Sequence, residues 1–203
     1  MSVPGTVHVV DDDAAMRDSL RMLLEASGLA VRTHDGAGVF LAEAANAIGV
    51  SCVLTDIRMP EIDGLELLKR LRDLGTRLPV IVMTGEGEIA IAVQAMKAGA
   101  IDFLEKPFSE AALLAAIGGA LEQSERLREV AATSAEAGAR LATLTPRERE
   151  VLDLLITGLP NKAIANQLGA SPRTIEVHRA RVLEKLKAHS LPDLVRLVLA
   201  AGT

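Results

Sequence analysis

Aromatic residues are nearly absent from this sequence of 203 residues, which has three Phe and neither Tyr nor Trp. Its cores must therefore be aliphatic, and hydrophobic residues make up 49% of the chain. Cys52 is the only cysteine, which excludes an internal disulfide bond, and its apolar surroundings favour a buried inert thiol. No apolar run of about 18 residues is present, so we expect no membrane-spanning segment. The N-terminus lacks the basic and apolar regions of a signal peptide, so we expect a cytoplasmic protein.

Charge divides the chain into two unlike parts. Residues 1–121 carry 10 basic and 17 acidic side chains, whereas residues 145–203 carry 9 basic and 6 acidic ones. The length suits two modest domains, which we expect at residues 1–121 and 144–203. The Ala- and Glu-rich stretch 122–143 predicts a linker that is helical at first and looser near Gly138, with a rigid helical connector and a disordered one both open. An acidic front and a basic back suggest two different tasks.

The first domain alternates short apolar runs with helical patterns. The runs are rich in Val and Ile and predict buried strands at 6–10, 29–33, 51–55, 79–84 and 100–104. Apolar residues between them recur at helical spacing. The fold class expected is therefore α/β, with a five-stranded parallel sheet and helices on both of its faces. In such sheets the ligand site lies beyond the carboxyl ends of the strands.

Acidic residues follow two of these expected strands. Asp11 and Asp12 close the first strand, and Asp56 closes the third. We expect the three carboxylates to converge, and a cation among them would relieve their repulsion. Mg²⁺ suits such oxygen ligands and also binds phosphate oxygens. Thr84 ends the fourth strand and Lys106 follows the fifth, where a hydroxyl and an ammonium group would stabilise a phosphoryl group transferred to Asp56 as nucleophile.

Each of these residues has a plainer interpretation when taken alone. An Asp after a strand is usually a turn former or a helix cap, and that is the role we expect for Asp13. Thr84 at a strand end is ordinary, and Lys106-Pro107 would fit a simple turn. The combination of all of them, each after its own strand, favours phosphoryl transfer.

The motifs VVDDD, LTDIRMPEIDG, VIVMTGEG and AGAIDFLEKPF resemble the receiver domain of bacterial two-component response regulators. The resemblance covers about residues 5–121 and implies a flavodoxin-like fold in which a sensor histidine kinase phosphorylates Asp56. The implied ligands of Mg²⁺ are Asp11, Asp12, Asp56 and the carbonyl group of Arg58. Thr84 and Lys106 would bind the phosphoryl oxygens, and Lys106-Pro107 would be a cis peptide.

The same resemblance implies a conformational switch. Phe103 stands where receivers carry a switching aromatic residue beside the threonine that is here Thr84. Because Phe has no hydroxyl group, this switch would work by packing alone. In many receivers phosphorylation remodels the face of the fourth helix and fifth strand, which here includes Val93 and Lys97. We expect phosphorylated homodimers to form through that face, with an ordinary solvated helix face as the alternative.

The pattern after residue 144 is purely helical and predicts an all-α domain of four helices. Thr145 and Glu148 fit a capping box at the start of the first, with Pro at the first helical position. Asn161 is expected to cap the second helix, 162–168. The later two are expected to open at Ser171-Pro172 and Leu191-Pro192. A short helix, a tight turn and a longer helix give helix-turn-helix spacing.

The third of these expected helices, residues 172–187, carries five Lys or Arg and two Glu. Its apolar stripe would consist of Ile175, Val182 and Leu186. On or beside the opposite side lie Thr174, Val177, His178, Arg181 and Lys185. A basic face of this kind can enter the major groove of DNA. A solvated amphipathic helix is the alternative, and no second His lies at zinc-ligand spacing from His178.

The stretch LTPREREVLDLLITGLPNKAIANQLGASPRTIEVHRARVLEKLKAHS resembles the LuxR-type helix-turn-helix of NarL/FixJ response regulators over about residues 144–200. The implied contacts to the DNA backbone are Asn161, Lys162, Thr174, His178 and Lys185. Those implied at base edges are Glu176, Val177 and Ala180, where Glu176 would accept from cytosine and Val177 would touch a thymine methyl group. Arg179 and Arg181 compete for these roles. The last helix would supply a dimer surface.

These observations predict a transcription regulator, by likeness an activator, and not an enzyme. Its expected partners are a histidine kinase, double-stranded DNA, RNA polymerase and a second copy of itself. A phosphatase with an aspartyl-phosphate intermediate usually has a second Asp two residues after the nucleophile, where this chain has Arg58. Whether phosphorylation relieves a contact between the domains or only permits dimerisation is open.

Overall fold

The computed structural model describes residues 5–44, 49–85 and 89–202, which form two compact units, Met1–Arg128 and Glu129–Thr203. The first unit is the expected α/β fold. Its strands all pair in parallel, in the order β2-β1-β3-β4-β5. The strands are β1 (Thr6–Val10), β2 (Ala30–His34), β3 (Ser51–Asp56), β4 (Val80–Thr84) and β5 (Asp102–Glu105).

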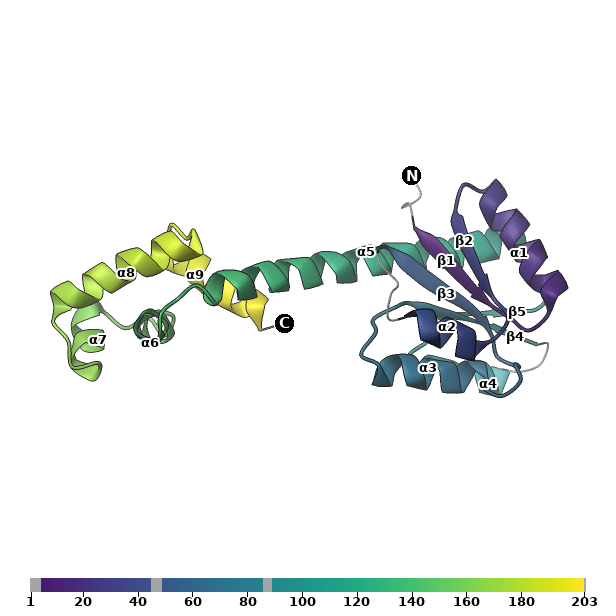
Figure 1. Ribbon diagram of the computed structural model, residues 1–203, viewed down its shortest axis with the longest axis horizontal. Coiled ribbons are helices and arrows are strands. Elements are labelled where there is room, and N and C mark those ends of the chain that lie inside the picture. The colour runs from purple at the N-terminus through teal and green to yellow at the C-terminus, as the bar shows by residue number, and fades with distance from the viewer. Residues whose placement is uncertain (1–4, 45–48, 86–88, 203) are drawn as a thin grey trace. The chain divides into compact units, whose positions relative to one another are not determined.

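Helices cover both faces of this sheet (Figure 1), and two separate clusters of aliphatic side chains fill the space beneath them. One face is covered by α1 (Ala14–Ala26) and the first half of α5 (Glu110–Leu141), whose Leu24 and Leu113 are fully buried. The other is covered by α2 (Ala37–Ala44), α3 (Gly64–Asp73) and α4 (Ile89–Ala98). Both clusters are almost wholly aliphatic, as the scarcity of aromatic residues predicted.

Cys52 on β3 is fully buried, and this burial raises the pKa of its thiol to about 12. The expectation of an inert thiol is confirmed, because the reactive thiolate is strongly disfavoured in such surroundings.

The fifth strand begins two residues later than expected. The cause is the way α4 ends: the N–H of Gly99 donates to the carbonyl group of Met96, and the N–H of Ala100 to that of Ala95. Gly99 has a φ of 104°, a conformation that glycine adopts without a steric penalty. Ala100 therefore closes the helix instead of opening the strand.

Helix α5 differs most from expectation. It continues without a break from Glu110 to Leu141, so the loosening expected near Gly138 is not found. A glycine inside a helix costs about 1 kcal/mol, but the surrounding Ala, Glu and Arg residues are strong helix formers. The last turns are also held by packing, since Ala137 and Leu141 are buried in the second unit.

The second unit is helical throughout its described residues and has its own aliphatic core. It contains the end of α5, then α6 (Pro146–Leu155), α7 (Asn161–Gln167), α8 (Pro172–Leu186) and α9 (Leu191–Ala201). The capping box of Thr145 and Glu148 is present, and Ser171 and Ser190 cap α8 and α9. Asn161 does not cap α7: the cap position belongs to Pro160, which has no side-chain acceptor. None of the helices in the described part of the chain has both the length and the apolar character needed to cross a bilayer.

Candidate functional site

The register of the sheet brings the predicted residues of the first unit to one edge. Val10 of β1 lies beside Thr55 of β3, so the next residues, Asp11 and Asp56, leave adjacent strands at the same level. Thr84 ends β4 beside Glu105 of β5, and Lys106 follows directly. All four side chains thus belong to the carboxyl edge, where parallel sheets bind ligands.

The ammonium group of Lys106 joins two of the carboxylates. Its Nζ lies 2.8 Å from Oδ1 of Asp56 and 3.4 Å from Oδ2 of Asp11. Burial would lower the pKa of Lys106, but the hydrogen bond and charge of Asp56, together with those of Asp11, outweigh it and raise the pKa. The two carboxylates therefore favour the charged form of Lys106. The Lys106-Pro107 peptide is cis, as the resemblance implied.

Asp11 and Asp56 differ in how accessible they are. The side chain of Asp11 is 2% exposed, and its Oδ1 accepts the N–H of Asp13 at 2.9 Å. Burial, followed by the charge of Asp56, raises the pKa of Asp11 against the opposing effects of Asp13 and Lys106. The side chain of Asp56 is 15% exposed, and its Oδ2 accepts the N–H of Arg58 at 3.1 Å. Of the two carboxylates, that of Asp56 is the more accessible from solvent.

Two of the three carboxylates expected to converge, those of Asp11 and Asp56, contact the same ammonium group of Lys106. Asp12 is exposed, and no side-chain contact joins it to Asp11 or Asp56 in the described structure. Among residues 5–44, 49–85 and 89–202, no group of three or more His, Cys, Asp or Glu side chains has the arrangement of a metal site. Asp11 and Asp56 nevertheless fit Mg²⁺ chemically, because their hard oxygen donors already share one cation.

Three neighbours of the site complete its framework. Asp13 caps α1 through its side chain, which confirms the plainer interpretation given to it. Thr84 is 2% exposed at the end of β4. Arg17, which the sequence did not single out, donates from Nη1 to the carbonyl group of Asp11 at 2.7 Å. Its position one turn into α1 would have been a clue, but helical spacing alone did not distinguish it from a surface arginine.

Gly64 is a further residue that sequence reasoning missed. A Cβ atom at this position would lie 2.6 Å from the carbonyl oxygen of Asp56 and 3.0 Å from the Cα of Ile57. The N–H of Gly64 donates to the carbonyl group of Ile57 at 2.9 Å, so α3 begins in direct contact with the segment that follows Asp56. The only clue in the sequence is the glycine that ends the motif LTDIRMPEIDG.

The residues proposed for the switch and the dimer face lie on α4 and β5. Phe103 on β5 is 41% exposed, and Val93 on α4 is 47% exposed. Lys97 is exposed, and the neighbouring Met96 is exposed as well. A face with three exposed apolar side chains is available for another protein surface.

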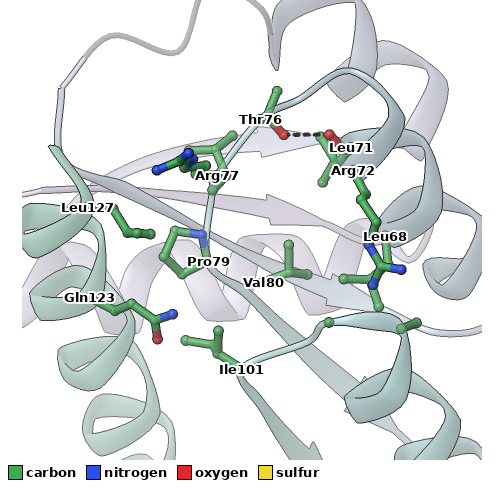
Figure 2. A pocket seen from close by; sticks show the side chains of 13 residues that line it. Leu68, Leu71, Arg72, Thr76, Arg77, Pro79, Val80, Ile101, Gln123 and Leu127 are labelled. Atoms are coloured by element: carbon green, nitrogen blue, oxygen red, sulfur yellow. Dashed lines mark hydrogen bonds between the residues drawn. The ribbon is translucent and has the colours of Figure 1, made fainter. Parts of the chain in front are cut away.

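The first unit also has a hollow of about 240 Å³ (Figure 2), and its lining includes Ala98 and Gly99 at the end of α4. It is formed by the end of α3, the segment before β4, the turn before β5 and α5, at the amino ends of the strands. Arg72 and Arg77 stand at its rim, and the hydroxyl of Thr76 donates to the carbonyl group of Leu71 at 2.9 Å. None of the predicted site residues lines it.

In the second unit, helix α8 has the two faces that its sequence predicted. Ile175, Val182 and Leu186 are fully buried against the other helices. The exposed residues of α8 include Thr174, Glu176, Val177, Ala180, Arg181, Glu184 and Lys185. His178 is only partly exposed, and its Nδ1 is buried without a hydrogen-bond partner in the described part of the chain.

Two residues expected to contact the DNA backbone already have partners within the unit. The Nζ of Lys185 lies 2.6 Å from Oε2 of Glu148. The Oδ1 of Asn161 accepts from Nη1 of Arg179 at 3.3 Å. Lys162 is exposed on α7. The basic charge of this unit is thus divided between internal contacts and the surface.

Comparison with known proteins explains the two units. Residues 7–118 match the family described as response regulator receiver domain, and residues 142–198 match that described as bacterial regulatory proteins, luxR family. The chain belongs to the response regulators of the NarL/FixJ family. This response regulator is 54% identical over 196 residues to transcriptional regulatory protein FixJ of Azorhizobium caulinodans, which covers 97% of this chain and 92% of that protein. It is 48% identical over 202 residues to FixJ of Bradyrhizobium diazoefficiens, covering 100% and 98%.

Solved structures agree with this assignment. Full-length FixJ from B. japonicum matches the response regulator with a TM-score of 0.60 and 48% identity, over 98% of this chain and 97% of that one. The response regulator StyR matches with a TM-score of 0.85 and 42% identity, over 97% and 99%. The chain is therefore a FixJ-like regulator of transcription, with a receiver domain and a LuxR-type DNA-binding domain.

Proposed function

We propose that a sensor histidine kinase phosphorylates Asp56 and that this modification controls DNA binding by the second unit. The observation that carries the proposal is the contact between Lys106 Nζ and Asp56 Oδ1 at 2.8 Å. It joins the more accessible carboxylate of the edge to a cation that can remain beside it after the carboxylate has become an acyl phosphate.

The transfer itself is a displacement at phosphorus. One carboxylate oxygen of Asp56 attacks the phosphorus atom of a phosphohistidine, an O–P bond forms, and the N–P bond breaks with its electron pair returning to the imidazole, which then takes up a proton. Lys106 is placed to neutralise the phosphoryl oxygens, with the hydroxyl of Thr84 as a further donor. When bound by Asp11, Asp12, Asp56 and the Arg58 carbonyl, Mg²⁺ would neutralise charge on these oxygens.

We place the response to phosphorylation on the face formed by Val93, Met96, Lys97 and Phe103. Phe103 is exposed before phosphorylation and has only apolar surface to offer, so an inward turn of its ring would change the shape and hydrophobicity of the face. We infer that two phosphorylated chains associate there, which would bring two DNA-binding units to a site with two-fold symmetry. Thr84, next to the acyl phosphate, would transmit the change.

For the second unit we propose that α8 enters the major groove. Glu176, Val177 and Ala180 are exposed on it, and Arg181 lies one residue beyond. Glu176 would accept from the amino group of cytosine and Val177 would touch a thymine methyl group. Of the expected phosphate contacts we retain Asn161, Lys162, Thr174 and His178, and we add the exposed Arg181. Lys185 is set apart from them, because its ammonium group already contacts Glu148. By its similarity to FixJ we propose an activator that acts on RNA polymerase.

Intact mass is the first test of this proposal. The purified chain is incubated with acetyl phosphate and Mg²⁺ beside the variant Asp56→Ala, and duplex binding is then measured for both. We expect one phosphoryl adduct that requires Mg²⁺ and is absent from the variant, together with tighter DNA binding by the modified chain. No adduct on the unchanged chain would refute the proposal and leave a constitutive DNA binder.

A further inference from the structure

Lys185 lies at an exposed position of α8, yet two acceptors of the second unit hold its ammonium group. Its Nζ lies 2.6 Å from Oε2 of Glu148 and 3.2 Å from the carbonyl oxygen of Thr143. The side chain of Glu148 is 3% exposed, whereas that of Lys185 is 35% exposed. The three residues belong to different segments: Thr143 to the turn after α5, Glu148 to α6 and Lys185 to α8. One ammonium group therefore ties α8 to two neighbouring segments.

The carboxylate of Glu148 has a second task that fixes its position. It accepts the N–H of Thr145 at 2.8 Å, while the hydroxyl of Thr145 accepts the N–H of Glu148 at 3.3 Å. This reciprocal pair is the capping box at the start of α6. If the side chain of Glu148 moved away from α6 together with Lys185, it would lose its hydrogen bond in the capping box. The contact therefore anchors the end of α8 to the start of α6.

We propose that Lys185 is a positioning residue that fixes the angle of α8 in the DNA-binding unit and is not a phosphate ligand. The inference rests on the proposed entry of α8 into the major groove, and it replaces the expectation that Lys185 contacts the DNA backbone. If Lys185 turned to a phosphate, the buried carboxylate of Glu148 would lose its cation, and an unpaired buried charge is strongly unfavourable.

Two other basic residues of the unit are used in the same way. Arg147 on α6 donates from Nη2 to the carbonyl group of Leu168, the residue that ends α7, at 2.6 Å. Arg179 on α8 contacts Asn161 at the start of α7. Arg181, by contrast, is exposed and forms no ion pair or side-chain hydrogen bond within the described residues. The internal contacts fix the helices against one another, and Arg181 is left for the DNA.

The salt dependence of DNA binding separates the two roles. The full chain and the variants Lys185→Met and Arg181→Met are titrated with a short labelled duplex of mixed sequence at several salt concentrations. Loss of one phosphate contact reduces the slope of log K against log salt by about 0.9. We expect that reduction for Arg181→Met and an unchanged slope, with weaker binding, for Lys185→Met. A reduced slope for Lys185→Met would overturn the inference.

A second-site change gives a test that does not depend on the phosphates. Glu148→Gln keeps an acceptor for Thr145 and removes the stranded carboxylate, so adding it to Lys185→Met should restore much of the lost DNA affinity. A direct phosphate contact would not be restored by a change at a buried residue on another helix. If the double variant binds no better than Lys185→Met alone, the inference is wrong.

Amide hydrogen exchange of the DNA-free chain tests the inference without DNA. If neither the unchanged chain nor any variant bound the duplex, that result would count against the proposed function, and hydrogen exchange would still test the role of Lys185. Lys185→Met should increase exchange in α6 and α8 about tenfold or more, because local opening becomes easier, and Glu148→Gln should reverse part of this. Arg181→Met should leave both helices as protected as in the unchanged chain. Equal protection in Lys185→Met would show that the contact positions nothing.

Discussion

The ammonium group of Lys106 lies 2.8 Å from the carboxylate of Asp56, although the two residues are 50 positions apart in the chain. Several carboxylates lie at the carboxyl edge of the sheet, and that of Asp56 is nearer to this ammonium group than that of Asp11. Asp11 also lies near Lys106, but it is buried and one of its oxygens is engaged by a backbone N–H. Asp56 combines a nearby cation with access from solvent, which is what an acceptor of phosphoryl groups needs.

The substitution Asp56→Asn should separate folding from phosphorylation. Asn has the same shape and can still accept a hydrogen bond from Lys106, so we expect an unchanged circular dichroism spectrum. We expect no mass adduct with acetyl phosphate and no gain in DNA affinity, because an amide is a poor nucleophile. Asp63→Asn is the matched control, since Asp63 caps α3 and should not be needed for the adduct. An adduct on the Asp56→Asn chain would identify another nucleophile.

Substitution of Lys106 should show how much its ammonium group stabilises the neighbouring carboxylates of Asp11 and Asp56. In buffer without Mg²⁺, we expect Lys106→Met to lower the free energy of unfolding of the receiver unit by about 1–3 kcal/mol, because buried Asp11 loses its counter-charge. Mg²⁺ should restore much of this, since a ligand that binds the folded state stabilises it. Urea unfolding with and without Mg²⁺ measures both effects. Lys69→Met, at a side chain that is 69% exposed, should change stability by less than about 0.5 kcal/mol.

Local sequence patterns predicted most of the helix caps, although the cap expected at Asn161 was wrong. The capping box at Thr145, the cap at Ser171 and the cap at Asp13 each depend on a few adjacent residues, and all three are present. The end of α5 was misjudged because Leu141 packs into the core of the second unit against distant residues and Ala137 is buried as well. Gly138 was visible in the sequence, whereas the packing that offsets its cost was not.

The same distinction applies to the candidate site. The common position of Asp11, Asp56 and Lys106 followed from parallel strands, whose carboxyl ends must meet at one edge. The partner of Lys185 did not follow from anything local, since Glu148 is 37 positions away on another helix. Periodicity places Lys185 on the polar side of α8, but it cannot say whether that side meets solvent, DNA or a buried carboxylate. Basic residues are therefore poorly assigned from sequence alone.

Gly64 should be sensitive to the smallest substitution. In Gly64→Ala the new methyl group would overlap the carbonyl oxygen of Asp56, so the backbone around Asp56 must shift. We expect about 1–3 kcal/mol of destabilisation and slower phosphorylation by acetyl phosphate. Gly119→Ala is the matched control, because its methyl group would meet no atom within 4 Å apart from its chain neighbours and the backbone of its own helix, and a helical Ala is favoured over Gly by about 0.5–1 kcal/mol. Unchanged phosphorylation in Gly64→Ala would show that the close contact is easily relieved.

A charge on the α4 face should prevent the proposed dimer. We expect Val93→Glu to accept phosphate normally but to sediment as a monomer, because two introduced carboxylates would face each other across the interface. Leu74→Glu provides the comparison: Leu74 is 58% exposed at the end of α3, and the phosphorylated variant should still dimerise. Sedimentation velocity before and after acetyl phosphate measures the change. Dimers of phosphorylated Val93→Glu would place the interface on another face.

Acid should weaken the DNA-binding unit through Glu148. Its hydrogen bond to Lys185, followed by that to the N–H of Thr145, lowers the pKa of Glu148 from 4.5 to about 2. The ionised form is favoured by folding, so this stabilisation is complete above pH 4.5 and is lost as the pH falls towards 2. Thermal unfolding followed by circular dichroism at pH values of about 5 and about 3 should therefore show a smaller decrease for Glu148→Gln than for the unchanged chain. Glu184→Gln, at an exposed position of α8, should behave like the unchanged chain. Equal decreases in all three would mean that the contact with Lys185 does not depend on the charge of Glu148.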